Sequence, residues 1–285
     1  MRHAVAKLAS QLKMIFKDHQ NSRARSVLQV FLSLIRLAAG RTMTASRMGG
    51  GSLIAVDLAT ANGKQMYRYG MPFDALAFGS LVSEGDFVVD AGANVGMYAL
   101  LAASRAGAKG LVVAIEPGEG TLRMLDRNLA LNRQTPIEII RAAVADRPSE
   151  AKFVEFEPGS GLAHLAAAGE VGDQALVAVT TIDEVVKRYE RALDVLKIDV
   201  EGAELLALKG ARLTLRDHSP RLFIEIEPSL LERSGTDPRE IDELLVECGY
   251  KTFFGVSATR RDHLMPLGSP SQASSVGSTN VLCLA

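Results

Sequence analysis

The chain of 285 residues is 47% hydrophobic and 23% charged, and its formal net charge is −1. A chain of this length forms one large domain or two small ones and buries about three quarters of its unfolded surface, so it needs no disulfide or metal for stability. This composition excludes fibrous and mostly disordered proteins, and two cysteines are too few for a disulfide-rich secreted domain or a structural zinc site, which favours a cytoplasmic location.

The first 47 residues are strongly basic. They carry nine Lys and Arg residues against one acid, Asp18, so this segment has a charge of +8 and the remainder −9 (−1 − 8). Apolar residues recur at helical spacing, and the apolar stretch 27–39 is shorter than the roughly 20 residues that cross a bilayer. We therefore expect a basic helical arm over 1–47, which packs on the main domain or contacts a membrane surface.

The glycine run Gly49-Gly50-Gly51 separates this arm from a main domain that we place at 48–285. Because that domain is acidic overall, it lacks the positive field of a nucleic-acid-binding protein. Two strand-like runs, 53–58 and 65–69, flank Asn62-Gly63 and predict a hairpin.

A helix is expected at 73–82, and from residue 86 strands alternate with helices. The strands are expected at 86–91, 111–115, 137–140, 152–157, 176–180, 195–198, 222–226, 251–256 and 280–284, and the helices at 95–105, 119–132, 182–189, 203–215 and 239–248. Parallel strands need such helical crossovers, so the pattern predicts an α/β domain with a doubly wound, mostly parallel sheet. Ligands of such sheets bind beyond the carboxyl ends of the strands.

The loop Asp90-Ala-Gly-Ala-Asn-Val-Gly96 follows the first parallel strand, and its glycines permit a tight turn and close approach of a ligand. Asn94 stands where a dinucleotide fingerprint has glycine. At the next two strand ends, Glu116 can accept hydrogen bonds from ribose hydroxyls and Asp146 from an adenine amino group. Each of these residues alone could be a turn or a helix cap, but together they predict a nucleoside cofactor.

Charged residues also follow the fourth and fifth parallel strands. Lys197 and Asp199 point to the same face of the fourth strand, and Glu201 would point there too if the strand continued. On the fifth strand, Glu225 and Glu227 likewise share one face. Charged groups on buried strands need partners or a polar cleft. The residues either form a structural Lys–Asp pair beside a helix start, or line a site for a cation and a hydroxyl-bearing substrate.

These motifs resemble the FkbM family of class I S-adenosylmethionine-dependent methyltransferases. The resemblance covers about residues 52–285 and is most specific at Lys-Ile-Asp-Val-Glu-Gly-Ala-Glu, 197–204. It implies a seven-stranded Rossmann-like sheet with one antiparallel strand, at 280–284, and S-adenosylmethionine as the cofactor. The cofactor-binding residues expected on this basis are Asp90, Gly92, Ala93, Asn94, Gly96, Glu116, Pro117 and Asp146.

A neutral hydroxyl is a poor nucleophile, so we expect Asp199 to take its proton or to orient it. Lys197 would lower the cost of charge on Asp199 or stabilise the forming alkoxide, and Glu201 and Glu225 would complete a polar wall. No metal is assigned, although carboxylates and water can hold Mg²⁺. The predicted reaction is methyl transfer to a hydroxyl oxygen of a sugar, a glycolipid or a polyketide-like small molecule.

Two alternatives stay open. A nicotinamide-dependent oxidoreductase or epimerase shares the sheet and the ribose acid, but Asn94 and the absence of a Tyr-x-x-x-Lys pair disfavour it. A non-catalytic nucleoside-binding protein would not need the Lys197 cluster. His164, in the Gly/Ala-rich loop 158–172, is a candidate base or substrate contact, although a single loop histidine more often faces solvent, and the loop could instead be a mobile lid over the acceptor pocket. Neither the acceptor nor the oligomeric state follows from the sequence.

Overall fold

The computed structural model describes residues 43–47, 52–57, 73–132, 137–155, 159, 163–166, 174–257 and 264–285. Most of the expected basic arm and the strand expected at 65–69 lie outside these residues. The chain divides into two compact units, one of residues 1–48 and 53–71 and the other of residues 49–52 and 72–285.

Within the first unit, β1 (Met43–Arg47) pairs antiparallel with β2 (Leu53–Asp57). Residues 43–47, which we expected to end a helical arm, therefore form a strand, and its pairing crosses the boundary expected at residue 47. The partner of β2 is thus on the N-terminal side of the glycine run. Hydrogen bonds to a neighbouring strand, which local helical spacing does not reveal, decide the conformation here.

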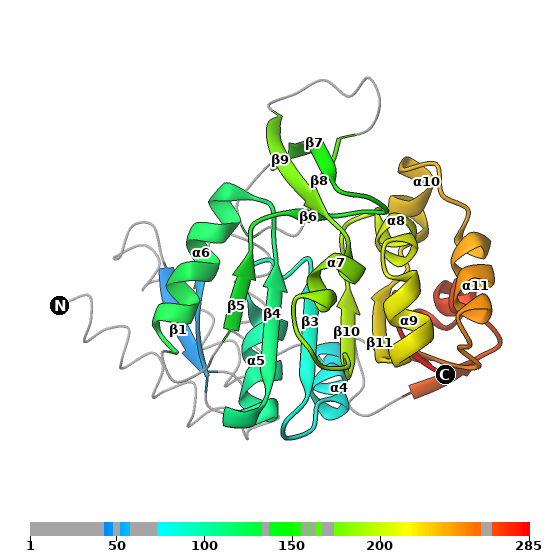
Figure 1. The fold of residues 1–285 in the computed structure, drawn as a ribbon, viewed down its shortest axis with the longest axis horizontal. Coiled ribbons are helices and arrows are strands. Elements are labelled where there is room, and N and C mark those ends of the chain that lie inside the picture. The colour runs from blue at the N-terminus through cyan, green and yellow to red at the C-terminus, as the bar shows by residue number, and fades with distance from the viewer. Residues whose placement is uncertain are drawn as a thin grey trace, which may run out of the picture. The chain divides into compact units, whose positions relative to one another are not determined.

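The second unit is built on an eight-stranded sheet, which Figure 1 shows at the centre of the fold. Its order is β13 (Leu264–Leu267), β12 (Thr252–Val256), β14 (Asn280–Leu284), β11 (Arg221–Glu225), β10 (Val195–Ile198), β3 (Phe87–Ala91), β4 (Leu111–Ile115) and β5 (Ile137–Ile140). From β5 to β11 neighbouring strands are parallel, whereas β14 is antiparallel to both β11 and β12. The seven predicted strands and the antiparallel final strand are confirmed, and β13 adds an eighth at the edge.

Helices cover both faces of this sheet, as Figure 1 shows. They are α4 (Phe73–Leu81), α5 (Met97–Ala106), α6 (Glu119–Ala130), α7 (Ile182–Lys187), α8 (Glu204–Lys209), α9 (Arg212–His218), α10 (Pro228–Arg233) and α11 (Pro238–Glu247). On one face, α4 and α5 bring Phe78 and Tyr98 against Phe223 of β11. On the other, apolar residues of α7, α8, α9 and α11 form the main core with β10 and β11. Among the described residues, no helix is long and apolar enough to cross a membrane.

The helix expected at 203–215 is interrupted at Gly210, where α8 ends and α9 follows. A Cβ at Gly210 would lie 2.1 Å from the carbonyl oxygen of Ala145, and the carbonyl of Gly210 accepts a hydrogen bond from the Asp183 amide. This close backbone approach requires a glycine, and it ends the helix.

A smaller sheet follows β5, in the order β6 (Ala143–Val144), β9 (Ala175–Thr180), β7 (Ser149–Val154) and β8 (His164–Leu165). The segments expected at 152–157 and 176–180 are two of these strands. His164 belongs to β8 and is buried, contrary to the expected exposure. Its short strand pairs with β7, so the pairing removes this residue from solvent.

Candidate active site

Two glycines shape the loop between β3 and α5. Gly92 has a φ of +76°, and a Cβ there would lie 1.8 Å from the carbonyl oxygen of Asp199. Gly96 has a φ of +87°, and its Cβ would meet the Leu125 side chain at 2.5 Å. The Gly92 amide donates to the carbonyl of Ile115 at the tip of β4. Side chains are excluded at both glycines, so the loop lies directly against the tips of β10 and β4.

Glu116 joins the tips of β3 and β4. Its two carboxylate oxygens accept hydrogen bonds of 2.9 Å from the backbone amides of Asn94 and Gly118. Burial raises the pKa of Glu116 to about 7, and these two hydrogen bonds only partly offset the effect. A carboxylate has about four acceptor sites, so the pair of ribose hydroxyls can still be bound. Beside it, the Asn94 Oδ1 atom is buried and has no hydrogen-bond partner among the described residues, which suits a ligand that supplies one.

Asp146 follows the strand β6 and does not come directly after β5. The chain leaves β5 through Arg141 and enters β6 of the smaller sheet, and Asp146 follows β6 as an exposed residue, 3.9 Å from Arg147. The residue next to the Glu116 backbone is Ala142, because the amides of both residues donate to the carbonyl of Ile140. A contact between Asp146 and an adenine amino group stays a prediction.

Sequence reasoning missed Glu155, which follows β7. Its carboxylate accepts hydrogen bonds from the amides of Gly120 and Thr121 and so caps α6. A Cβ at Gly118 would lie 2.7 Å from Glu155 and 3.1 Å from Glu116, so the two carboxylates flank this glycine. Pro117 and Gly118 thus link the tip of β4 to the first turn of α6, which Glu155 of the smaller sheet caps. The local sequence around Glu155 does not indicate this contact.

Lys197 lies beneath the loop, at the centre of the site. Its Nζ atom is 3.1 Å from Asp90 Oδ1 and 3.3 Å from Asp199 Oδ2, and it donates to the carbonyl of Gly92 at 3.2 Å. It also lies 4.7 Å from the centre of the Tyr98 ring. Burial disfavours its charge, but attraction by Asp199 and Asp90 outweighs burial and raises the pKa of Lys197. Lys197 is therefore a buried ammonium that links the tips of β3 and β10.

Three acids converge as expected at the tips of β10 and β11. Carboxylate oxygens of Asp199, Glu201 and Glu225 lie within 4.8 Å of one another. Burial and then repulsion by Asp199 raise the pKa of Glu225 to about 10 and that of Glu201 to about 8. Glu201 and Glu225 therefore keep protons at neutral pH, and each can both donate and accept hydrogen bonds. The oxygens of the cluster are also spaced for a divalent cation, and we assign none.

Two neighbouring acids do not join this cluster. Glu204 is buried, and its Oε1 atom accepts from the amides of Val200 and Gly202, which fixes the turn that carries Glu201. Glu227, which we expected to face the same way as Glu225, instead caps α10 by accepting from the amide and hydroxyl of Ser229. The alternation fails because β11 ends at Glu225.

Asp74 at the start of α4 is a further acid that the sequence did not reveal. Its carboxylate accepts hydrogen bonds from the Tyr98 hydroxyl at 3.1 Å and from the Asn280 amide at 3.2 Å. Burial raises the pKa of Asp74, and the charge of Asp199 adds to the effect. In the sequence this residue looks like an ordinary acid in the first turn of a helix.

The fold and the site together define a class of protein. The sheet has its antiparallel strand β14 inserted between β11 and β12, and a glycine loop after β3 lies beside an acid at the tip of β4. This is the Rossmann-like fold of class I methyltransferases. Residues 90–252, more than half of the chain, match the model of the methyltransferase FkbM domain. The chain therefore belongs to the FkbM family of S-adenosylmethionine-dependent methyltransferases, which removes the nicotinamide alternative.

Several known proteins are similar to part of this chain. A hexuronic acid methyltransferase, AglP of Haloferax volcanii, is 30% identical over 174 residues, which are 59% of this chain and 65% of AglP. The methyltransferase sdnD of Sordaria araneosa is 27% identical over 195 residues, 58% of this chain and 73% of sdnD. A crystal structure of methyltransferase FkbM from Methylobacillus flagellatus KT superposes with a TM-score of 0.49 and 20% identity, over 77% of this chain and 52% of that one. The match thus spans less than two thirds of AglP and about half of the solved protein.

Proposed function

We propose that this methyltransferase transfers the methyl group of S-adenosylmethionine to a hydroxyl oxygen of a small-molecule acceptor. The observation that carries the proposal is the position of Asp199. Its side chain is 30% exposed at the tip of β10, its backbone touches the glycine loop, and Lys197 holds its carboxylate from below. A fixed and accessible carboxylate beside the nucleoside loop is suited to receive a proton from an acceptor.

S-adenosylmethionine brings a methyl group that its sulfonium already activates. Glu116 would bind the ribose hydroxyls, and Asn94 Oδ1, which has no hydrogen-bond partner among the described residues, would accept a hydrogen bond from the cofactor. Gly92, Ala93 and Gly96 would let the loop backbone approach it, and Pro117 would fix the end of β4. Asp90 is fully buried against Lys197, so we assign it the positioning of the loop rather than direct contact.

In the transfer, Asp199 would take the hydroxyl proton of the acceptor, and S-adenosylmethionine would supply the activated methyl group and carry away the electron pair of its carbon–sulfur bond. Lys197 is 1% exposed and already has three oxygen neighbours, so it offsets the charge of Asp199 without reaching an alkoxide. Glu201 and Glu225 would hydrogen-bond the acceptor from the opposite side. Most of the rate would come from aligning oxygen, carbon and sulfur.

For the methyl acceptor we propose a chemical class, which is a small molecule with a free hydroxyl group. AglP is named for a hexuronic acid, which supports a sugar hydroxyl, and a glycolipid or a polyketide-like alcohol has the same nucleophile. Contact of residues 1–47 with a membrane surface would suit a glycolipid, and that contact stays a prediction.

The test is release of S-adenosylhomocysteine in the presence of sugar, glycolipid and polyketide-like alcohols, with the methylated atom assigned by NMR. We expect an O-methyl product, and Asp199→Asn should lower kcat about 10²–10⁴-fold with unchanged cofactor affinity. The exposed Asp217→Asn serves as the matched control. Methylation on nitrogen or carbon, or full turnover by Asp199→Asn, would contradict the proposal.

A further inference from the structure

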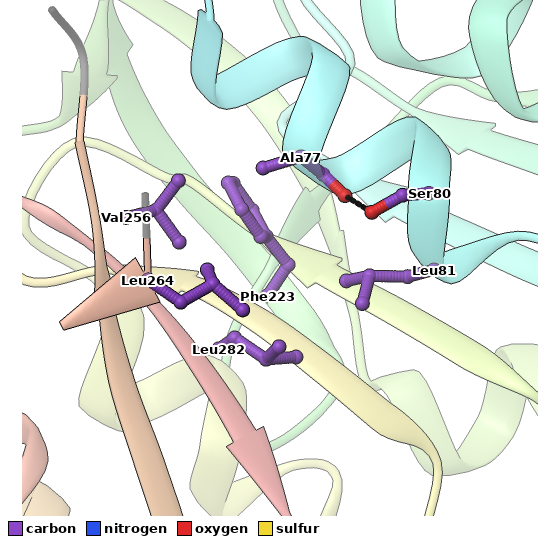
Figure 2. A pocket seen from close by; sticks show the side chains of 7 residues that line it. All are labelled: Ala77, Ser80, Leu81, Phe223, Val256, Leu264 and Leu282. Carbon is purple, nitrogen blue, oxygen red and sulfur yellow. Dashed lines mark hydrogen bonds between the residues drawn. The ribbon is translucent and has the colours of Figure 1, made fainter. Parts of the chain in front are cut away.

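An apolar pocket of about 120 Å³ lies between α4 and the far strands of the sheet. Figure 2 shows side chains from five elements pointing into it: Ala77 and Leu81 of α4, Phe223 of β11, Val256 of β12, Leu264 of β13 and Leu282 of β14. Ser80 adds a hydroxyl, but this group donates to the carbonyl of Ala77 within the helix. The lining therefore offers a ligand mainly apolar surface.

The pocket and the acid cluster lie on the same face of the sheet. Side chains alternate along a strand, so Phe223 and Glu225 of β11 point to the same side. Phe223 is the register partner of both Lys197 and Leu282. The Tyr98 ring lies 6.1 Å from the Phe223 ring, and its centre is 4.7 Å from the Lys197 ammonium. Lys197, Tyr98 and Phe223 thus form one continuous layer of side chains, which begins in the active site and ends in the wall of the pocket.

The strand ends connect the two places as well. Glu225 of the acid cluster is the register partner of Asn280, which is also the partner of Val256 in the pocket lining. The Asn280 side chain donates to Asp74, whose pKa responds to the charge of Asp199. Glu225, Asn280 and Val256 thus lie side by side on three neighbouring strands, so the acid cluster and the pocket lining adjoin on this face of the sheet.

We propose that the pocket binds a hydrocarbon part of the methyl acceptor, so that the substrate is an amphiphilic alcohol with an aliphatic or alicyclic group beside the methylated hydroxyl. This inference rests on the proposed function. The size fits, because a cavity of about 150 Å³ holds benzene and this pocket would hold a group of about five carbons. Leu264 at its edge is 41% exposed, so a ligand would cover apolar surface that now faces water.

The proposal is tested by binding, with 1-hexanol and ethanol as probes of the cofactor-loaded protein. Methyl NMR signals of Val256, Leu264 and Leu282 report occupancy without any turnover. Each buried methylene strengthens binding about fourfold, so 1-hexanol should bind at least tenfold more tightly than ethanol and shift these signals.

Ala77→Leu fills the pocket and should reduce the preference for hexanol to less than twofold, whereas Ala130→Leu, at the exposed end of α6, should preserve it. Leu264→Ser should weaken hexanol binding in the same direction even if the filled variant folds poorly. Equal affinity for the two alcohols, or an Ala77→Leu protein that keeps its preference, would overturn the inference. Because the readout is binding, failure of methyl transfer to any alcohol would count against the proposed function alone.

Discussion

Lys197 and Asp90 are register partners on neighbouring parallel strands, and their side chains form an ion pair of 3.1 Å with exposures of 1% and 0%. Burial raises the pKa of Asp90, and the charge of Lys197 opposes that rise. Each charge is therefore stabilised by the other, and the pair joins β3, which precedes the glycine loop, to β10, which precedes Asp199.

Removing one member of this ion pair should destabilise the folded protein. We expect Lys197→Met to lower the free energy of unfolding by about 3–5 kcal/mol, because it leaves Asp90 buried without its countercharge. Asp90→Asn combined with Lys197→Met should recover part of that loss. Urea unfolding of the two single variants and the double variant measures the coupling, and additive losses would show that the pair does not act as a unit.

Gly92 offers a second test, with Gly85 as the control. Both have a positive φ, but a Cβ at Gly85 meets nothing within 4 Å, whereas one at Gly92 would lie 1.8 Å from the carbonyl oxygen of Asp199. Gly85→Ala should therefore cost only about 1–2 kcal/mol of backbone strain. Gly92→Ala should cost more and should weaken cofactor binding, which thermal unfolding and calorimetry would measure. Equal effects of the two substitutions would mean that the loop does not depend on its contact with β10.

The raised pKa of Glu116 predicts that the stability of the folded protein depends on pH. The pKa of this residue is about 7 in the folded protein and 4.5 when unfolded, so the folded state holds the proton more strongly. The contribution of Glu116 is fully present below pH 4.5 and is lost as the pH rises through 7, by on the order of 3 kcal/mol. Unfolding of the cofactor-free protein at several pH values should show this loss, and Glu116→Gln should make the profile flatter between pH 4.5 and 7. A variant whose profile parallels that of the wild type would contradict the assignment.

Short apolar runs with clear ends could be predicted from the sequence. The strands at Leu111–Ile115, Val195–Ile198 and Asn280–Leu284 have the expected bounds, because strands buried inside a sheet are short and mostly apolar. The convergence of Asp199 with Glu225 could be predicted as well, since the carboxyl ends of neighbouring parallel strands meet at one edge of the sheet.

Features that depend on packing between distant segments could not be predicted. Asp74 and Glu155 join the site from a helix that precedes the sheet and from the second sheet, and neither has a local signal. The break at Gly210 depends on the backbone of Ala145, sixty-five residues earlier in the chain. The edge strand β13 contains a proline and little periodicity, so only its pairing with β12 defines it.

The central claim about this protein is that S-adenosylmethionine binds beside Glu116. Calorimetric titration of the full chain should show binding of S-adenosylmethionine and none of NAD. Glu116→Gln should weaken that binding at least tenfold, because one of the two acceptor oxygens is replaced by an amide group that cannot accept a ribose hydrogen bond. Glu119→Gln, three residues along and with a side chain that is 88% exposed, should leave binding unchanged. If Glu116→Gln bound S-adenosylmethionine as tightly as the wild-type protein, the site described here would not be the cofactor site.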